Sequence, residues 1–182
     1  MERYRIQPGA AVYFVTFSVV DWLPVFVSEA ACRIVTDSLN FCFQQKGLCT
    51  NAFVIMPTHL HLILFHRTFD ARQLSTSMAD LRKFTGRSLS EFCARHMPKS
   101  FSEAFRRAAT VDRSRRIWQP SRHPETIETE PFWKQKLDYL HDNPRRKGLV
   151  SHPDHWRFSS SAYYSSGGRV ASDVSIQPID WS

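Results

Sequence analysis

The chain has no long apolar run and no recognisable leader. No hydrophobic stretch approaches the roughly 20 residues that a membrane-spanning helix needs. The first residues, "MERYRIQPGAAVYF", lack an apolar segment followed by a small-residue cleavage site, so they do not have the pattern of a secretory signal. We therefore expect a cytoplasmic protein without a membrane partner.

Cysteine is scarce, and the metal signatures built on cysteine are missing. The four cysteines form no C-x-x-C pair, and we expect reduced, mostly buried thiols at Cys32, Cys42, Cys49 and Cys93. No cysteine or third histidine is spaced to complete a zinc tetrahedron with His59 and His61. The zinc-deaminase signature, H-x-E followed by P-C-x-x-C, is also absent. A structural zinc site and a zinc deaminase are both disfavoured.

The chain does contain enough apolar material for one folded domain, together with an uneven charge. Its 182 residues are 42% hydrophobic and 13% aromatic, which is typical of a globular protein. The net charge is +7, and residues 67–123 hold thirteen Lys and Arg against five Asp and Glu. A localised basic region suits a polyanion such as nucleic acid. Charge alone fits a solvated basic surface equally well.

Hydrophobic periodicity predicts an α+β domain. The expected elements are a strand at 11–20, a helix at 28–46, strands at 49–56 and 59–65, and helices at 71–95 and 130–142. We expect the last helix to end near Asn143, because Pro144 follows it. The order β-α-β-β-α, with a candidate short strand at "RIWQPS", predicts a ferredoxin-like (RRM-like) sandwich with an antiparallel sheet and helices on one face.

Two histidines lie close together in "VIMPTHLHLIL", residues 54–64. In a strand, residues two apart point to the same face, so His59 and His61 are expected to project together. Leu60, Leu62 and Leu64 then point to the opposite face. Two imidazoles and one oxygen ligand suit Mg²⁺ or Mn²⁺ acting on a phosphate. A pair of individually hydrogen-bonded histidines is the alternative, and a bare H-x-H motif does not exclude it.

A second dense stretch, "FWKQKLDYLHDNPRRKGLV", contains a candidate nucleophile. Tyr139 and Asn143 are four residues apart on the predicted helix, and Lys136 lies three residues before Tyr139 on the same side. A phenol, an amide oxygen and an ammonium group can therefore converge, and Lys136 is placed to stabilise a phenolate. The alternative is a tyrosine at the edge of the core and an asparagine that ends the helix.

These stretches in this order resemble the REP-associated tyrosine transposases, a group within the HUH single-tyrosine transposases. The similarity covers most of the chain. "RYRIQPGAAVYFVTF" is similar to the opening strand of the family, and "VIMPTHLHLIL" to its M-P-x-H-x-H hairpin. "LRKFTGRSLSEF" is similar to its basic helix and "IWQPSRHPETI" to its W-Q segment. "YLHDNPRRKGLVSHPDHWRFSSSAYY" is similar to its Tyr-x-x-x-Asn-Pro segment and the tail that follows.

The resemblance implies a DNA-processing enzyme whose tyrosine-bearing helix lies near the His-x-His strand. His59 and His61 match the metal ligands, Tyr139 the nucleophile, and Asn143 the third ligand, where many relatives carry glutamine. The implied substrate is single-stranded DNA with a hairpin, as in REP-like repeats. The implied product is a 5′-phosphotyrosine together with a free 3′-OH. The residues that we expect to bind DNA phosphates are Arg82, Lys83, Arg87, Arg113, Arg115 and Arg116.

We expect residues 1–150 to form the catalytic domain and residues 151–182 to be a C-terminal extension packed on it or trailing from it. The protein would act as a monomer or a homodimer and associate with the nucleoid. Three alternatives remain open. They are a non-catalytic nucleic-acid-binding module, a metal-dependent phosphodiesterase that uses water, and an RNA-binding domain. The last is the weakest, because the aromatic signature of RRM strands is not evident.

Overall fold

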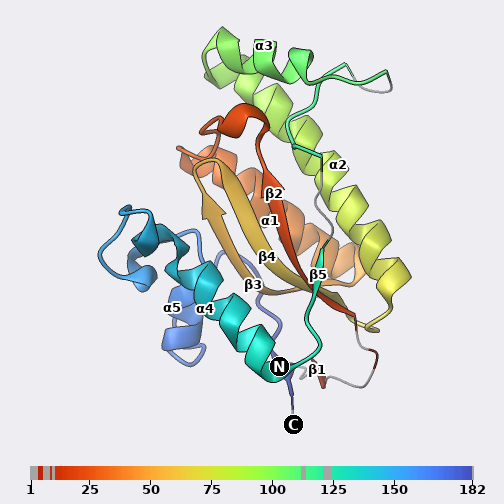
Figure 1. Ribbon diagram of the computed structural model, residues 1–182, viewed down its shortest axis with the longest axis vertical. Helices are drawn as coiled ribbons and strands as arrows, with labels where there is room; N and C mark the ends of the chain where they lie inside the picture. The colour runs from red at the N-terminus through yellow and green to blue at the C-terminus, as the bar shows by residue number, and fades with distance from the viewer. Residues whose placement is uncertain (1–3, 6–8, 10, 112–113, 121–123, 182) are drawn as a thin grey trace.

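A four-stranded antiparallel sheet separates two helical layers in the computed structural model of the protein (Figure 1). The structure describes residues 4–5, 9, 11–111, 114–120 and 124–181. The strands lie in the order β3 (Leu48–Met56), β4 (His59–His66), β2 (Val12–Ser18) and β5 (Glu125–Thr126). The predicted α+β, ferredoxin-like architecture is confirmed, including the antiparallel hairpin of β3 and β4.

Helices α1 (Glu29–Lys46) and α2 (Ala71–His96) cover one face of the sheet. Leu60, Leu62 and Leu64 point into this layer, as the period of two predicted, and all three are buried. The ends of α1 agree with its sequence signals. The Ser28 hydroxyl accepts a hydrogen bond from the Ala31 N–H at 3.3 Å, and Gly47 ends the helix at a φ of +66°.

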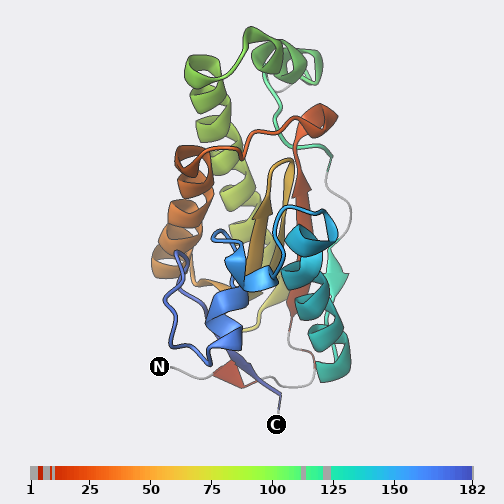
Figure 2. The same cartoon turned by 90° about the vertical axis from the view of Figure 1, so that its left-hand side faces the viewer.

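Helix α4 (Glu130–Arg146) packs against the opposite face, as Figure 2 shows. Its buried stripe, Leu137 and Leu140, belongs to a second core cluster that includes Phe14, Ile63 and Phe65 from the sheet. These sheet residues alternate in sequence with those of the first layer. The helix that carries Tyr139 therefore covers the face from which His59 and His61 project.

The predicted end of the last helix was wrong, because α4 continues through Pro144 to Arg146. A proline inside a helix removes one hydrogen bond to the carbonyl four residues earlier. In the last turn that loss is small, because the following N–H groups still find partners. Lys147 N donates to the Asn143 carbonyl at 3.1 Å, and Leu149 N donates to the Pro144 carbonyl at 3.0 Å. The extra turn brings Arg146 onto the helix.

After α2, the described residues form a short helix and then segments that lie against the sheet. Helix α3 (Lys99–Arg107) lies near the end of the sheet at which a single-turn helix, η1 (Val20–Trp22), follows β2. The candidate strand at "RIWQPS" is reduced to one bridge between Trp118 and Val19, and Glu125–Thr126 supply the fourth strand instead.

The C-terminal residues run along the outer side of β3. They contain the single-turn helix η2 (Pro153–His155), helix α5 (Ser161–Ser165) and β6 (Ile179–Asp180), which pairs with β1 (Tyr4–Arg5). Single bridges join Ser159 to Val54 and Ile176 to Thr50. The edge of β3 is thereby covered, which removes a row of unpaired strand groups.

The cysteines and the helices bear on two further expectations from the sequence. The four cysteines are free thiols, and all four are buried, as predicted. Within the part of the chain that the structure describes, no helix is long and apolar enough to cross a membrane.

Candidate active site

His59 and His61 lie side by side on β4, and their ring centroids are 4.8 Å apart. Each ring is held through Nδ1 by a threonine hydroxyl. Nδ1 of His61 lies 2.8 Å from Oγ1 of Thr16, on the paired strand β2, and Nδ1 of His59 lies 3.0 Å from Oγ1 of Thr58. No hydrogen bond engages Nε2 of either ring among the described residues. A ring held at one nitrogen can offer the other as a ligand.

Burial keeps both histidines neutral. It is the main cause that lowers the pKa of His61 to about 3, with smaller effects from the His59 and Lys136 charges. Burial also lowers the pKa of His59 to about 4, and the Lys147 charge adds to this shift. Neutral imidazole is the form that binds metal ions. Both rings are therefore in the ligating form at neutral pH.

Tyr139 lies next to this pair. Its ring centroid is 5.5 Å from that of His61 and 6.1 Å from that of Phe14. The side chain is 41% exposed, and its hydroxyl has no hydrogen-bond partner among the described residues. The Tyr139 hydroxyl is therefore available to contact a substrate. It lies beside two imidazole nitrogens that are also available.

Asn143 lies one turn beyond Tyr139 on the same side of α4. The Tyr139 ring lies beside that of His61, so Asn143 is on the side of α4 that faces the histidine strand. The Asn143 side chain is 5% exposed, yet its amide forms no hydrogen bond within the described residues. Asn143 is not among the described residues whose fully buried polar atoms lack a partner, so its amide reaches solvent and can meet a ligand there.

These three side chains suit a divalent cation. Two neutral imidazoles and an amide oxygen form an open set of nitrogen and oxygen donors, which fits an ion that also contacts a phosphate. Among the described residues no group of three or more His, Cys, Asp or Glu could hold a metal. A site here therefore depends on the Asn143 oxygen in addition to the histidine pair.

The structure pairs Lys136 with a carboxylate and an aromatic ring. Its ammonium group pairs with Glu125 at 2.7 Å and lies 4.9 Å from the centroid of the Phe14 ring. The predicted role of Lys136 with the phenolate stays a prediction. A second cation on this helix, which the sequence analysis missed, lies over the Tyr139 ring. The Arg146 guanidinium is 5.3 Å from the centroid of the Tyr139 ring, and its spacing of seven residues became visible only once the helix extended past Pro144.

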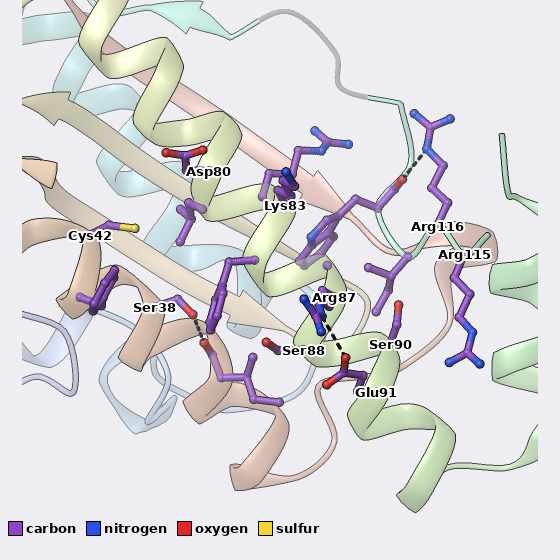
Figure 3. A pocket seen from close by; sticks show the side chains of 18 of the residues that line it. Ser38, Cys42, Asp80, Lys83, Arg87, Ser88, Ser90, Glu91, Arg115 and Arg116 are labelled. Atoms are coloured by element: carbon purple, nitrogen blue, oxygen red, sulfur yellow. Dashed lines mark hydrogen bonds and ion pairs between the residues drawn. The ribbon is translucent and has the colours of Figure 1, made fainter. Parts of the chain in front are cut away.

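The predicted DNA-binding cations lie in the other helical layer. Lys83, Arg87, Arg115 and Arg116 line a groove of about 1230 Å³ between α1, α2 and residues 114–118 (Figure 3). Arg87 also pairs with Glu91 at 3.1 Å. Arg82 borders the same groove, donates to the Gln119 carbonyl and lies over the Phe17 ring. The structure does not bring these cations next to Tyr139. Arg113 lies outside the described residues.

The aromatic side chains near the site differ in their availability. Trp118 is 4% exposed, and its Nε1 donates to the Thr85 hydroxyl at 3.2 Å, so it belongs to the core. Tyr164 donates to the Asn51 carbonyl at 2.9 Å. Trp22 is 54% exposed, and its ring centroid is 5.7 Å from that of His59. The sequence analysis did not single out Trp22, because nothing in "VVDWLP" marks it.

Comparison with known proteins identifies the fold. No family model and no curated protein sequence matches the chain. A solved structure of a REP-associated tyrosine transposase bound to a REP hairpin matches it with a TM-score of 0.63 and 18% sequence identity. The match covers 100% of this chain and 94% of that one. The chain therefore has the fold of a REP-associated tyrosine transposase over its whole length.

Proposed function

We propose that this protein is a single-stranded DNA nickase and strand transferase that uses Tyr139 as its nucleophile. The observation that carries the proposal is the position of Tyr139. Its half-exposed ring lies beside His61, and its hydroxyl has no hydrogen-bond partner among the described residues. The structural neighbour was solved with a REP hairpin, so we propose hairpin-bearing repeat DNA as the substrate.

The proposed reaction is a transesterification. The Tyr139 oxygen forms a bond to phosphorus, the bond from phosphorus to the 3′ oxygen breaks, and the phenolic proton is balanced by protonation of the leaving oxygen. The products are a 5′-phosphotyrosine and a free 3′-OH. The 3′-OH of another strand can attack the phosphotyrosine and rejoin the DNA without a nucleoside triphosphate. The phosphotyrosine bond conserves the energy of the phosphodiester bond that was broken.

His59, His61 and Asn143 would hold a divalent ion, Mg²⁺ or Mn²⁺. When bound, such an ion neutralises charge on the phosphate oxygens and orients the phosphate. The chain itself orients the histidines through Thr16 and Thr58, and the Tyr139 ring contacts both His61 and Arg146. The cations of the groove would bind phosphates elsewhere on the same strand, which supplies affinity more than sequence selectivity.

The test is an adduct assay. The protein is incubated with 5′- and 3′-labelled hairpin-bearing single strands and Mn²⁺, followed by denaturing gels and peptide mapping. We expect a covalent adduct on Tyr139 alone, and none with Tyr139→Phe. Tyr163→Phe, which also removes one phenolic oxygen, is the matched control and should react like the wild type. Cleavage by Tyr139→Phe without an adduct would support a phosphodiesterase, and binding without cleavage by the wild type would support a non-catalytic module.

A further inference from the structure

Trp22 combines an unfavourable backbone conformation with an exposed ring. Asp21 and Trp22 both have positive φ angles, +53° and +52°. Bulky residues rarely adopt this conformation, and such strain concentrates at functional positions. Trp22 is nevertheless 54% exposed, and its indole N–H forms no hydrogen bond among the described residues. The cost of this backbone conformation is therefore not offset by packing of the ring in the core.

The surrounding chain holds this turn in place. Val19 N donates to the Thr58 carbonyl at 2.9 Å, and Val20 N donates to the Ile117 carbonyl at 2.7 Å. The Gln119 side chain donates to the Val19 carbonyl at 2.9 Å. Val19 and Val20 are themselves buried. The backbone on which the strained residues lie is therefore well defined.

Trp22 lies between the candidate active site and a hollow that borders the basic groove. On one side its ring contacts His59 of the candidate active site, with 5.7 Å between the ring centroids. On the other it lines a hollow of about 420 Å³ that also includes Arg116 and Gln119. Arg116 lines the basic groove of the opposite layer as well. A strand that ran from Tyr139 past His59 to Arg116 would therefore pass Trp22.

We propose that Trp22 is a stacking platform for an unpaired nucleobase next to the scissile phosphate. The occupant is inferred from chemistry. An exposed aromatic face between a phosphate site and several guanidinium groups fits a chain of planar bases and anionic phosphates, and stacking on aromatic rings is the usual mode for single strands. The stacked base would direct the strand from the tyrosine side into the basic groove. The inference rests on the proposed function and adds a base-binding site to it.

The test measures binding to the bases separately from binding to the sugar-phosphate backbone. Binding of an oligothymidine of about 20 nucleotides, longer than one typical binding site, is measured by fluorescence anisotropy. A strand of equal length composed only of abasic sugar-phosphates is the second probe. Both are tested with Tyr139→Phe protein, so that no strand is cut, and with Trp22→Ala or Trp22→Phe added. Val170→Ala, an exposed apolar position in the C-terminal tail, is the control.

We expect Trp22→Ala to weaken oligothymidine binding by about tenfold and to leave abasic-strand binding unchanged. Trp22→Phe should restore most of the affinity, because it keeps a ring. Equal weakening for both probes, no weakening for either, or absence of oligothymidine binding by the starting protein would overturn the inference. A Tyr139 adduct without any dependence on Trp22 would refute the stacking site alone. Base-dependent binding through Trp22 without an adduct would refute catalysis alone.

Discussion

The guanidinium group of Arg146 lies over the aromatic ring of Tyr139, 5.3 Å from its centroid. Arg146 forms no ion pair with a carboxylate among the described residues, whereas its neighbour Arg145 pairs with Asp142 at 2.5 Å. An exposed guanidinium is a good partner for phosphate oxygens. The helix thus carries the proposed nucleophile and an available cation within one short stretch.

Arg146→Ala should slow strand cleavage by about tenfold or more, since removal of a hydrogen bond to a charged group costs about 1.5–3 kcal/mol. Arg146→Lys should recover part of the rate, because it keeps the charge but not the planar fork. Single-turnover cleavage at saturating protein measures the effect. Arg145→Ala is the matched control and should cleave at nearly the wild-type rate. Equal rates for both alanine variants would show that Arg146 does not act on the phosphate.

His59→Ala and His61→Ala should each abolish cleavage while DNA binding stays within a few-fold of the wild type. The reason is that each variant removes one of the two available imidazole nitrogens beside Tyr139. Gel cleavage assays with added Mn²⁺ and anisotropy with labelled single strands give the two readouts. His96→Ala, at an exposed histidine on α2, should leave both unchanged. If either active-site variant cleaves normally in metal-stripped buffer, the metal site is wrong.

Simultaneous replacement of Lys83, Arg115 and Arg116 by alanine should weaken binding to all single strands alike. For each phosphate that the variant no longer neutralises, the salt slope should fall by about 0.7. Binding constants measured across a range of salt concentrations give the slope. Arg33→Ala is the comparison, because Arg33 is already paired with Glu29 at 2.7 Å on the outer side of α1. An unchanged slope in the triple variant would show that the groove does not hold DNA.

Acidification should destabilise the fold below pH 6.5. Burial lowers the pKa of His141 to about 4, from an ordinary value of about 6.5, and His59 and His61 shift in the same direction. Between these values the unfolded chain binds protons that the folded chain excludes, so stability falls as pH falls. Each such histidine contributes a loss of up to about 1.4 kcal/mol per pH unit.

Urea unfolding at several pH values between 7 and 4.5 tests this expectation. His141→Gln should make the free energy of unfolding depend less steeply on pH, because glutamine does not titrate. The glutamine amide can still reach the Ser160 hydroxyl, which His141 Nε2 contacts at 2.8 Å. Stability that is flat or that rises on acidification would contradict the buried, neutral state of these rings.

Trp22→Gly should stabilise the fold and weaken DNA binding at the same time. Glycine adopts positive φ without the steric cost, so relief of the strain should add about 1 kcal/mol to the free energy of unfolding. Urea unfolding of the variant and the wild type measures this gain. A decrease in stability would show that the contact of the Trp22 ring with His59 outweighs the strain.

Local patterns in the sequence determined the three long strands β2, β3 and β4, the helices α1, α2 and α4, and the spacing of functional groups along them. His59 and His61 alternate with three leucines along β4. The histidines therefore point to one face of the sheet and the leucines to the other, because side chains alternate in any strand. The spacing of Tyr139 and Asn143 places both on one side of a helix for an equally local reason. Ser28 and Gly47 marked the ends of α1 through capping chemistry.

Only the tertiary structure decided which helix covers which face, and the candidate site depends on that choice. Packing of Leu137 and Leu140 against Phe14 and Ile63 brings Tyr139 to the histidines, whereas the same packing pairs Lys136 with Glu125. Helix α4 passes through Pro144 because neighbouring groups satisfy its last turn, and this extension places Arg146 over Tyr139. The strain at Trp22 likewise depends on hydrogen bonds to strands and loops distant in sequence. Such long-range contacts leave no periodic pattern in the sequence. They depend on how several segments pack together, and not on the secondary-structure preference of one segment.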